Sequence, residues 1–379
     1  MRSFFKSACL LAAIIAAAAS CSERDRYIAI TGYAQGGTYS VKMNLNGSRG
    51  PVGKSPEAIR NGIDSILNAI DTTLSGYNKG SVLSRFNAGE TVFADGMFRE
   101  MYGKAYSYYE ETGGALDVAS GPLFNIWGFG FTRDSLPSGD VVAATLASCG
   151  MKRLRDAIPE GLFSGNDLLL EPGPLPVLNF NAIAQGYSCD KVASYLHGMG
   201  VKDMLVDIGE IYCEGVNPAG KPWKIGIDRP VDGNNSPGAD LDGVWESGGK
   251  ACGIVTSGNY RKFYVRDGRK YSHTIDPRTG WPVEHNLLSA PIVAPNAADA
   301  DAYATYCMVI GMEAAREFIL SNAGRIEGYL IYSDETGEMQ EWASPGFSIV
   351  SQLLSRTSEP WTYRRRNHFQ GLCPTRTWT

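Results

Sequence analysis

Apolar side chains recur at helical spacing in two stretches of the chain. In residues 56–74, Ile59, Ile63 and Ile70 fall on one face, and the preceding Ser55 is a typical N-cap before a proline at the first helical position. A similar spacing predicts a second helix over 97–112, and we expect further helices over 140–149, 186–198, about 297–310 and 312–322. Gly113-Gly114 is a typical stop for the second helix.

Other stretches alternate between apolar and polar residues, or are rich in β-branched and aromatic residues, as strands do. They are residues 38–45, 203–208, 223–228, 251–256, 261–266 and 269–274, and a hairpin over 328–342 that turns around 335–337. Asp267-Gly268 predicts a turn between two of them, and the Pro/Gly/Asp/Asn-rich segment 230–248 predicts a surface loop. The irregular order of strands and helices favours an α+β fold of mixed, mostly antiparallel sheets with packed helices.

The first twenty residues have the pattern of a signal peptide. Arg2 and Lys6 precede an apolar run of twelve residues, which is too short for a stable transmembrane helix. Small residues then lead to Cys21, as in a bacterial lipobox, although Ala18 stands where Leu is more usual. We therefore expect a signal peptide over 1–20, lipidation at Cys21 and a polar tether over 21–27; the alternative is ordinary signal cleavage beside an incidental cysteine.

Composition narrows the function classes. The 379 residues carry a formal net charge of -5 and are 44% hydrophobic, which is ordinary for a globular protein and argues against a nucleic-acid partner. Beyond Cys9 and Cys21, six cysteines remain without CxxC or zinc-like spacing, so a structural zinc site is not expected. Whether these cysteines pair cannot be deduced from their positions.

A carboxylate and a hydroxyl share one face of the helix expected at 297–310. Asp301 and Thr305 are four residues apart and are flanked by alanines that allow close approach. Oxygen donors of this kind suit a hard cation such as Mg²⁺. The plainer explanation, an acidic residue complementing the helix dipole, fits Asp299 better than Asp301.

Other polar residues stand among small or apolar neighbours. His273, one of four histidines, comes just before an Asp-Pro turn, where it is a candidate general base or phosphate contact; a hydrogen-bonded structural histidine is the alternative. Trp127 and Phe129 either stack on a flat ring or fill the core. The junction at 179–186 leads into a helix and could present backbone groups to a phosphate. Neither GxGxxG, a Walker motif nor GxSxG is found.

A set of motifs in a fixed order resembles the FAD:protein FMN transferases, the ApbE-type flavin transferases. The motifs are LSGY (74–77), GGALDVASGPL with WGFG, NFNAIAQGYSCDKV, VDIGE (206–210), GIDRP (226–230), TSGNYRKF, YSHTIDPRTGWPV and ADAYATYCMVIG. The resemblance spans about residues 28–330. It implies a single catalytic unit over 28–350 with a peripheral tail at 351–379.

The resemblance also implies chemistry. FAD is the substrate and Mg²⁺ the cofactor, FMN is joined to a Thr or Ser hydroxyl of an acceptor protein, and AMP leaves. The acceptor would be a membrane redox subunit. A lipid-anchored location in the bacterial cell envelope, facing the periplasm, is typical of such proteins.

Site residues follow from the matched motifs. The resemblance makes His273 the base and Asp301 the catalytic carboxylate, with Asp301, Thr305 and the Ala182 carbonyl as metal ligands. Flavin-nucleotide contacts would come from Gln35, Tyr77, Ala115, Leu116, Asp117, Asn179, Gln185 and Ile275.

Four positions depart from the commoner family residues. Gln35 replaces Met, Asn179 and Asn259 replace Asp, and Gln185 replaces Lys or Glu. These changes predict altered FAD affinity with activity retained. Two alternatives stay open at this stage: a Mg²⁺-dependent FAD pyrophosphatase that gives FMN and AMP, and a non-catalytic FAD-binding lipoprotein.

Overall fold

The fold comes from a computed structural model that describes residues 26–48, 50–129, 136–157, 168–170, 177–234, 236–260, 263–266 and 269–351. The expected signal peptide, Cys21, the Asp267-Gly268 turn and the tail from residue 352 lie outside these residues. Two expected boundaries fall inside strands. Tyr27, expected in the tether, begins β1, and Ser351, expected in the tail, ends β19.

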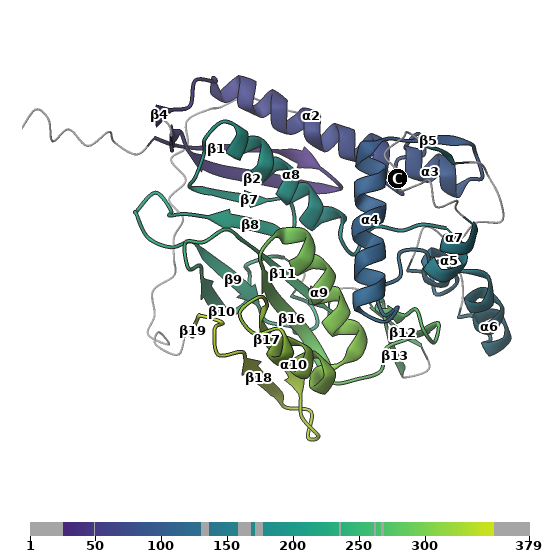
Figure 1. The fold of residues 1–379 in the computed structure, drawn as a ribbon. Coiled ribbons are helices and arrows are strands. Elements are labelled where there is room, and N and C mark those ends of the chain that lie inside the picture. The colour runs from purple at the N-terminus through teal and green to yellow at the C-terminus, as the bar shows by residue number, and fades with distance from the viewer. Residues whose placement is uncertain are drawn as a thin grey trace, which may run out of the picture.

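An eight-stranded sheet forms the centre of the molecule (Figure 1). Its order is β1 (Tyr27–Ala34), β2 (Gly37–Asn44), β7 (Met204–Asp207), β8 (Ile211–Glu214), β11 (Cys252–Gly258), β16 (Leu287–Ala294), β17 (Glu327–Ser333) and β18 (Met339–Ala343). All seven ladders in this sheet are antiparallel. The α+β prediction is therefore confirmed.

Alternate residues of this sheet belong to two different cores, because side chains of a strand point to opposite faces. Val255 and Leu330 pack beneath helices, whereas Ile254 and Ile331 pack against a second, small sheet. The helices α2 (Pro56–Leu74), α8 (Ala184–Gly198), α9 (Ala297–Ile310) and α10 (Met312–Ser321) cover the first face. The small sheet, β19 (Ile349–Ser351), β10 (Leu241–Glu246) and β9 (Lys224–Asp228), covers the other.

The prediction of a loop over 230–248 was wrong in its second half, where β10 lies. Gly243 and Trp245 are buried and alternate with less buried neighbours, so this strand packs one face against the main sheet. Its Gly and Asp residues concealed the alternation. Gly243 has a packing role, since a Cβ there would lie 2.6 Å from Ile349 Cδ1.

Beyond the sheet, α4 (Gly96–Glu111) runs along its edge and separates it from a group of short elements (Figure 1). These are α3 (Val82–Asn87), β5 (Val92–Ala94), α5 (Gly121–Ile126), α6 (Gly139–Ser148), α7 (Met151–Ala157) and β6 (Leu168–Leu170). The remaining pairs are β3 (Asn46–Gly47) with β4 (Gly50–Pro51), β12 (Phe263–Arg266) with β13 (Arg269–Ser272), and β14 (Ile275–Asp276) with β15 (Trp281–Pro282).

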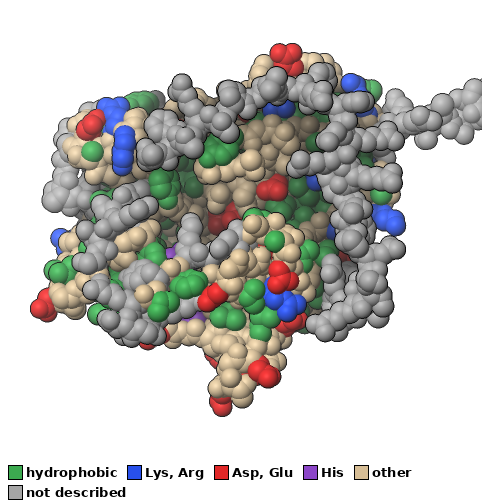
Figure 2. Space-filling model, turned by 180° about the vertical axis from the view of Figure 1, so that it is seen from behind, with side chains coloured by type: hydrophobic (Ala, Val, Ile, Leu, Met, Phe, Trp, Pro, Cys, Tyr) green, Lys and Arg blue, Asp and Glu red, His purple; other side chains and the backbone are tan. Residues whose placement is uncertain are grey.

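The helices predicted from the apolar period are confirmed to within two residues at each end. In α2 the Ser55 side chain accepts a hydrogen bond from the Ala58 N–H, as its N-cap position predicts. In the described part of the chain, no helix combines the length and the apolar character needed to span a bilayer. On the face seen from behind, the described surface shows acidic and basic side chains without a continuous basic patch (Figure 2).

Candidate functional site

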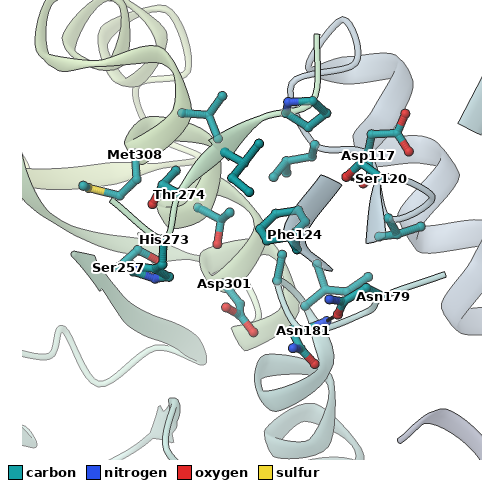
Figure 3. A pocket seen from close by; sticks show the side chains of 18 of the residues that line it. Asp117, Ser120, Phe124, Asn179, Asn181, Ser257, His273, Thr274, Asp301 and Met308 are labelled. Carbon is teal, nitrogen blue, oxygen red and sulfur yellow. Dashed lines mark hydrogen bonds between the residues drawn. The ribbon is translucent and has the colours of Figure 1, made fainter. Parts of the chain in front are cut away.

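A cavity of about 370 Å³ lies where α9 and the end of β11 meet the segment after α4 and the turn before α8. Its volume is in the range of small-molecule sites. Asp117, Glu210 and Asp301 are among the lining residues, and no Lys or Arg is among the described ones. In Figure 3 the Asp301 side chain lies between His273 on one side and Asn179 and Asn181 on the other.

The first turn of α9 is held by side chains from two directions. The Asn296 side chain accepts a hydrogen bond from the Asp299 N–H (2.8 Å). The Asp190 carboxylate, on α8, accepts from the N–H groups of Ala297 (2.8 Å) and Ala298 (2.9 Å). These acceptors satisfy donors that a helix leaves unpaired at its start, so they fix α9 against α8.

Glycines let the backbones approach at this point. A Cβ on Gly186, in α8, would lie 2.2 Å from the Ala297 carbonyl oxygen, and one on Gly253, in β11, would lie 2.3 Å from the Ala297 Cα. The alanines of α9 are themselves buried. The first turn of α9 therefore packs directly against the backbone of α8 at Gly186 and of β11 at Gly253. Each of these two contact points is called a notch.

Asp301 lies in the wall of the cavity and is only 5% exposed. The Gly186 N–H donates to its Oδ2 (3.0 Å), and burial is the main cause that raises the pKa of this carboxyl group. At the 179–186 junction, two backbone N–H groups are already engaged within the protein. Gly186 serves Asp301, and the Ala184 N–H donates to the Phe180 carbonyl.

The predicted metal ligands all belong to the lining of the cavity. The carboxylate of Asp301, the hydroxyl residue Thr305 one turn later and Ala182 all line the cavity. Among the described residues, no three His, Cys, Asp or Glu side chains converge on one point. The predicted set contains only one such side chain, Asp301, so its remaining donors are of the carbonyl and hydroxyl type. A buried carboxylate with neutral oxygen donors fits a hard cation.

His273 comes directly after β13 and also lines the cavity. Asn259 holds the residues on both sides of it. Its side chain accepts hydrogen bonds from the Ser272 Oγ and the Thr274 Oγ1, each 2.6 Å long. His273 also makes an edge-to-face contact with Phe129, with ring centroids 6.3 Å apart. Asn259, noted in the sequence only as a departure, thus positions the candidate base.

The two aromatic residues of WGFG have different roles. Trp127 is 1% exposed, stacks on Tyr271 and donates its indole N–H to the Gly280 carbonyl (2.7 Å). It therefore fills the core beneath the His273 segment. Phe129 lines the cavity and is the one of the two placed to touch a bound ring.

Asp117 lines the cavity, but its carboxylate is engaged elsewhere. It accepts hydrogen bonds from the N–H groups of Ala119 (2.8 Å) and Met151 (2.9 Å), the latter at the start of α7. Burial raises its pKa. Its carboxylate thus ties the segment after α4 to α7.

The structure brings nearly all of the predicted site residues to this cavity. Those lining it are Tyr77, Ala115, Leu116, Asp117, Asn179, Ala182, Gln185, His273, Ile275, Asp301 and Thr305. Gln35 is not among the lining residues. It adopts a positive φ of 52° in the β1–β2 turn, and its side chain contacts Ser188 Oγ on α8.

Several lining residues were not singled out from the sequence. They include Asn181, Glu210, Ser257, Thr274 and Met308. Each lies within or directly beside one of the motifs quoted above, which is the signal that could have identified them. Asn181 donates from its side-chain amide to the Tyr77 hydroxyl (3.2 Å) and so joins two walls of the cavity.

The fold and cavity define an α+β protein with a cavity of small-molecule size, lined by acidic and neutral oxygen-bearing residues. The family model described as the ApbE family matches residues 36–330. The chain therefore belongs to the ApbE family.

Relatives and solved structures agree with this assignment. A FAD:protein FMN transferase of Escherichia coli (strain K12) is 33% identical over 311 residues, 79% of this chain and 84% of that protein. One of Haemophilus influenzae is 31% identical over 342 residues, covering 86% and 94%. The flavin transferase ApbE of Vibrio cholerae superposes with a TM-score of 0.69 at 30% identity, covering 85% of this chain and 98% of that structure. The apo flavinyl transferase ApbE of Pseudomonas stutzeri gives 0.70 at 31%, covering 85% and 95%.

Proposed function

We propose that this protein transfers FMN from FAD to a Thr or Ser hydroxyl of an acceptor protein and releases AMP, with Mg²⁺ as cofactor. The names of the relatives support flavin transfer from FAD. The observation that carries the proposal is the cavity itself, whose lining includes Asp301, Thr305, Ala182 and His273.

The charge of the cavity supports the need for a cation. The pyrophosphate of FAD is anionic, while the described lining contains acidic side chains and no Lys or Arg. Asp301, Thr305 and the Ala182 carbonyl would hold Mg²⁺, which offsets phosphate charge and polarises the phosphorus–oxygen bond when bound. Positioning and charge neutralisation dominate phosphoryl transfer.

In the reaction, the acceptor hydroxyl oxygen forms a bond to the FMN phosphorus as the bond from that phosphorus to the AMP phosphate oxygen breaks. In this proposal His273 takes the hydroxyl proton, and AMP leaves with the bridging oxygen. A positioned base contributes roughly 10²–10⁴-fold to such a step. Asn259 and Phe129 hold the imidazole on this side of the cavity.

The location is part of the proposal. The leader pattern over 1–20 and the small residues before Cys21 support a lipid anchor in the cell envelope, with the catalytic unit facing the periplasm. An acceptor in that compartment would be a membrane redox subunit. A Cys21→Ala variant should leave the membrane fraction; retention there would contradict the lipid anchor.

The test uses the full chain, purified in detergent, with FAD, Mg²⁺ and an acceptor domain whose target Thr carries a free hydroxyl. Mass spectrometry should find FMN on the acceptor, chromatography should find an equal amount of AMP, and EDTA should abolish both. AMP with free FMN and an unlabelled acceptor would identify a pyrophosphatase, and bound, intact FAD would identify a binding protein. Either result would overturn the proposal.

A further inference from the structure

Two cysteines face each other across neighbouring strands, and neither lines the cavity described above. Cys213 in β8 and Cys252 at the start of β11 are direct partners in the antiparallel register. Their Sγ atoms lie 3.8 Å apart. Of the five cysteines that the structure describes, these are the two whose sulfur atoms contact each other.

The two cysteines lie at the two ends of the segment 214–251, which leaves the main sheet after β8 and returns at β11. This segment is called the β9–β10 excursion, and the point where its ends meet is its neck. The chain leaves at the end of β8, forms β9 and β10 of the small sheet, and returns at Cys252, 39 residues after Cys213. The Gly215 N–H donates to the Gly249 carbonyl (2.9 Å) directly above the two cysteines. A covalent bond here would hold both ends of the excursion together.

The two side chains also share a face and differ in exposure. Cys213 is fully buried in the core between the two sheets, and Cys252 packs at the edge of that core and is partly exposed. Cys252 is therefore the one of the two cysteines that is partly open to solvent. The other described thiols differ: Cys189 contacts the Glu210 carbonyl oxygen and Cys307 is buried in α9.

We propose that Cys213 and Cys252 are a modification site, at which a disulfide-bearing oxidant forms a cross-strand disulfide that closes the neck of the β9–β10 excursion. The Cys252 thiolate attacks the oxidant, which forms a mixed disulfide and releases one thiol. The Cys213 sulfur, after losing its proton to solvent, then attacks Cys252 Sγ and releases the second thiol. Two protein thiols are oxidised and one oxidant disulfide is reduced.

The surroundings give the bond a defined character. A disulfide is about 2.05 Å long, so small side-chain rotations have to close the remaining gap between the sulfur atoms. The neighbouring Cys252 sulfhydryl and burial raise the pKa of Cys213. A thiol of high pKa is seldom ionised, so the attack by Cys213 that forms the bond is slow. Such a thiol is also a poor leaving group, so the bond, once formed, resists reduction.

The test takes the full chain, reduced with dithiothreitol, desalted and incubated with glutathione disulfide. After denaturation in N-ethylmaleimide, peptide mapping should find Cys213 linked to Cys252, with Cys189 and Cys307 alkylated. Because the bond closes a loop of this length, Tm of the oxidised chain should exceed that of the reduced chain by about 5 °C. The Tm difference should persist in Cys307→Ala and vanish in Cys252→Ala.

Alkylated Cys213 and Cys252 after oxidation, a stable glutathione adduct on Cys252, or a link to another cysteine would each overturn the proposal. The mapping needs no variant to fold. It also needs no FAD or acceptor, so its outcome is independent of the proposed flavin transfer.

Discussion

The two sides of the cavity are built in different ways. The side formed by α9 belongs to the core: its alanines are buried, its first turn is capped by Asn296 and Asp190, and its backbone fills the notch at Gly186. The His273 side is a short segment after β13, held by the Asn259 side chain. One side is fixed by packing of backbones and the other by a few side-chain hydrogen bonds.

This difference suggests a division of labour. A cation site gains from a rigid support, because its ligands have to keep their separations. A base beside an entering hydroxyl needs a set orientation but little packing. We expect changes on the α9 side to alter stability or metal binding, and through metal binding the metal-dependent turnover. Changes on the His273 side should alter turnover directly, with FAD binding kept.

Asp301→Asn should have the largest effect. It replaces the charged ligand by a neutral amide of the same shape, and metal-dependent turnover should fall by about 10³-fold. Because burial raises the pKa of Asp301, its ionised form is costly in the folded protein, and Tm in EDTA should not fall. Asp299→Asn, on the same helix and away from the cavity lining, is the matched control. Retained Mg²⁺-dependent activity in Asp301→Asn would remove this ligand.

Gly186→Ala tests whether packing fixes the α9 side. The added Cβ would meet the Ala297 carbonyl oxygen at 2.2 Å, and the free energy of unfolding should fall by about 2–3 kcal/mol. Gly198→Ala at the end of the same helix is the control, because its Cβ meets nothing within 4 Å. It should be neutral or stabilising by up to about 1 kcal/mol. If urea denaturation gave the same free energy of unfolding for both variants, the close packing of Gly186 against Ala297 would not be what fixes α9.

Asn259→Ala tests the His273 side. It removes the acceptor shared by Ser272 and Thr274, so kcat should fall about tenfold, the effect of a misplaced base, while KM for FAD changes little. Asn259→Asp keeps an acceptor oxygen and should restore most of kcat. A parallel rise in KM would instead make Asn259 a determinant of FAD binding.

The smallest expected effect is on the pH dependence of stability, and it comes from His285, which contacts α9. His285 is held neutral: its Nε2 contacts the Met308 carbonyl (2.8 Å), its Nδ1 accepts from the Leu287 N–H, and burial lowers its pKa. Since the unfolded chain binds this proton more readily, stability is complete above pH 6.5 and falls as the pH drops below it. Tm should fall by about 2 °C more between pH 7 and 5.5 in the wild type than in His285→Gln. If Tm fell equally with pH in the wild type and in His285→Gln, His285 would be excluded as the source of the pH dependence.

The helices could be predicted because their signals are local, and the spacing of Asp301 and Thr305 put both on one face of α9. That these two residues bind a cation stays a prediction. β16 was not predicted, since a strand buried on both faces reads as a continuous apolar run without alternation. β10 was missed because Gly and Asp conceal its alternation.

Other features depend on residues that are distant in the sequence. Trp127 fills the core because its indole N–H bonds to Gly280, far along the chain. Asp117 holds the start of α7 because its carboxylate accepts from the distant Met151 N–H. The same holds for Asp190, whose carboxylate reaches Ala297. Such contacts are set by tertiary packing, which no local pattern contains.

The central claim is that α9 supports binding and His273 supports the reaction. The most direct measurement compares the FAD dissociation constant and the FMN-transfer rate of His273→Ala with those of the wild type, in the presence of Mg²⁺. We predict a rate lower by roughly 10²–10⁴-fold with FAD affinity changed less than about threefold. An equal loss of rate and affinity would contradict the account and make His273 a residue that binds FAD.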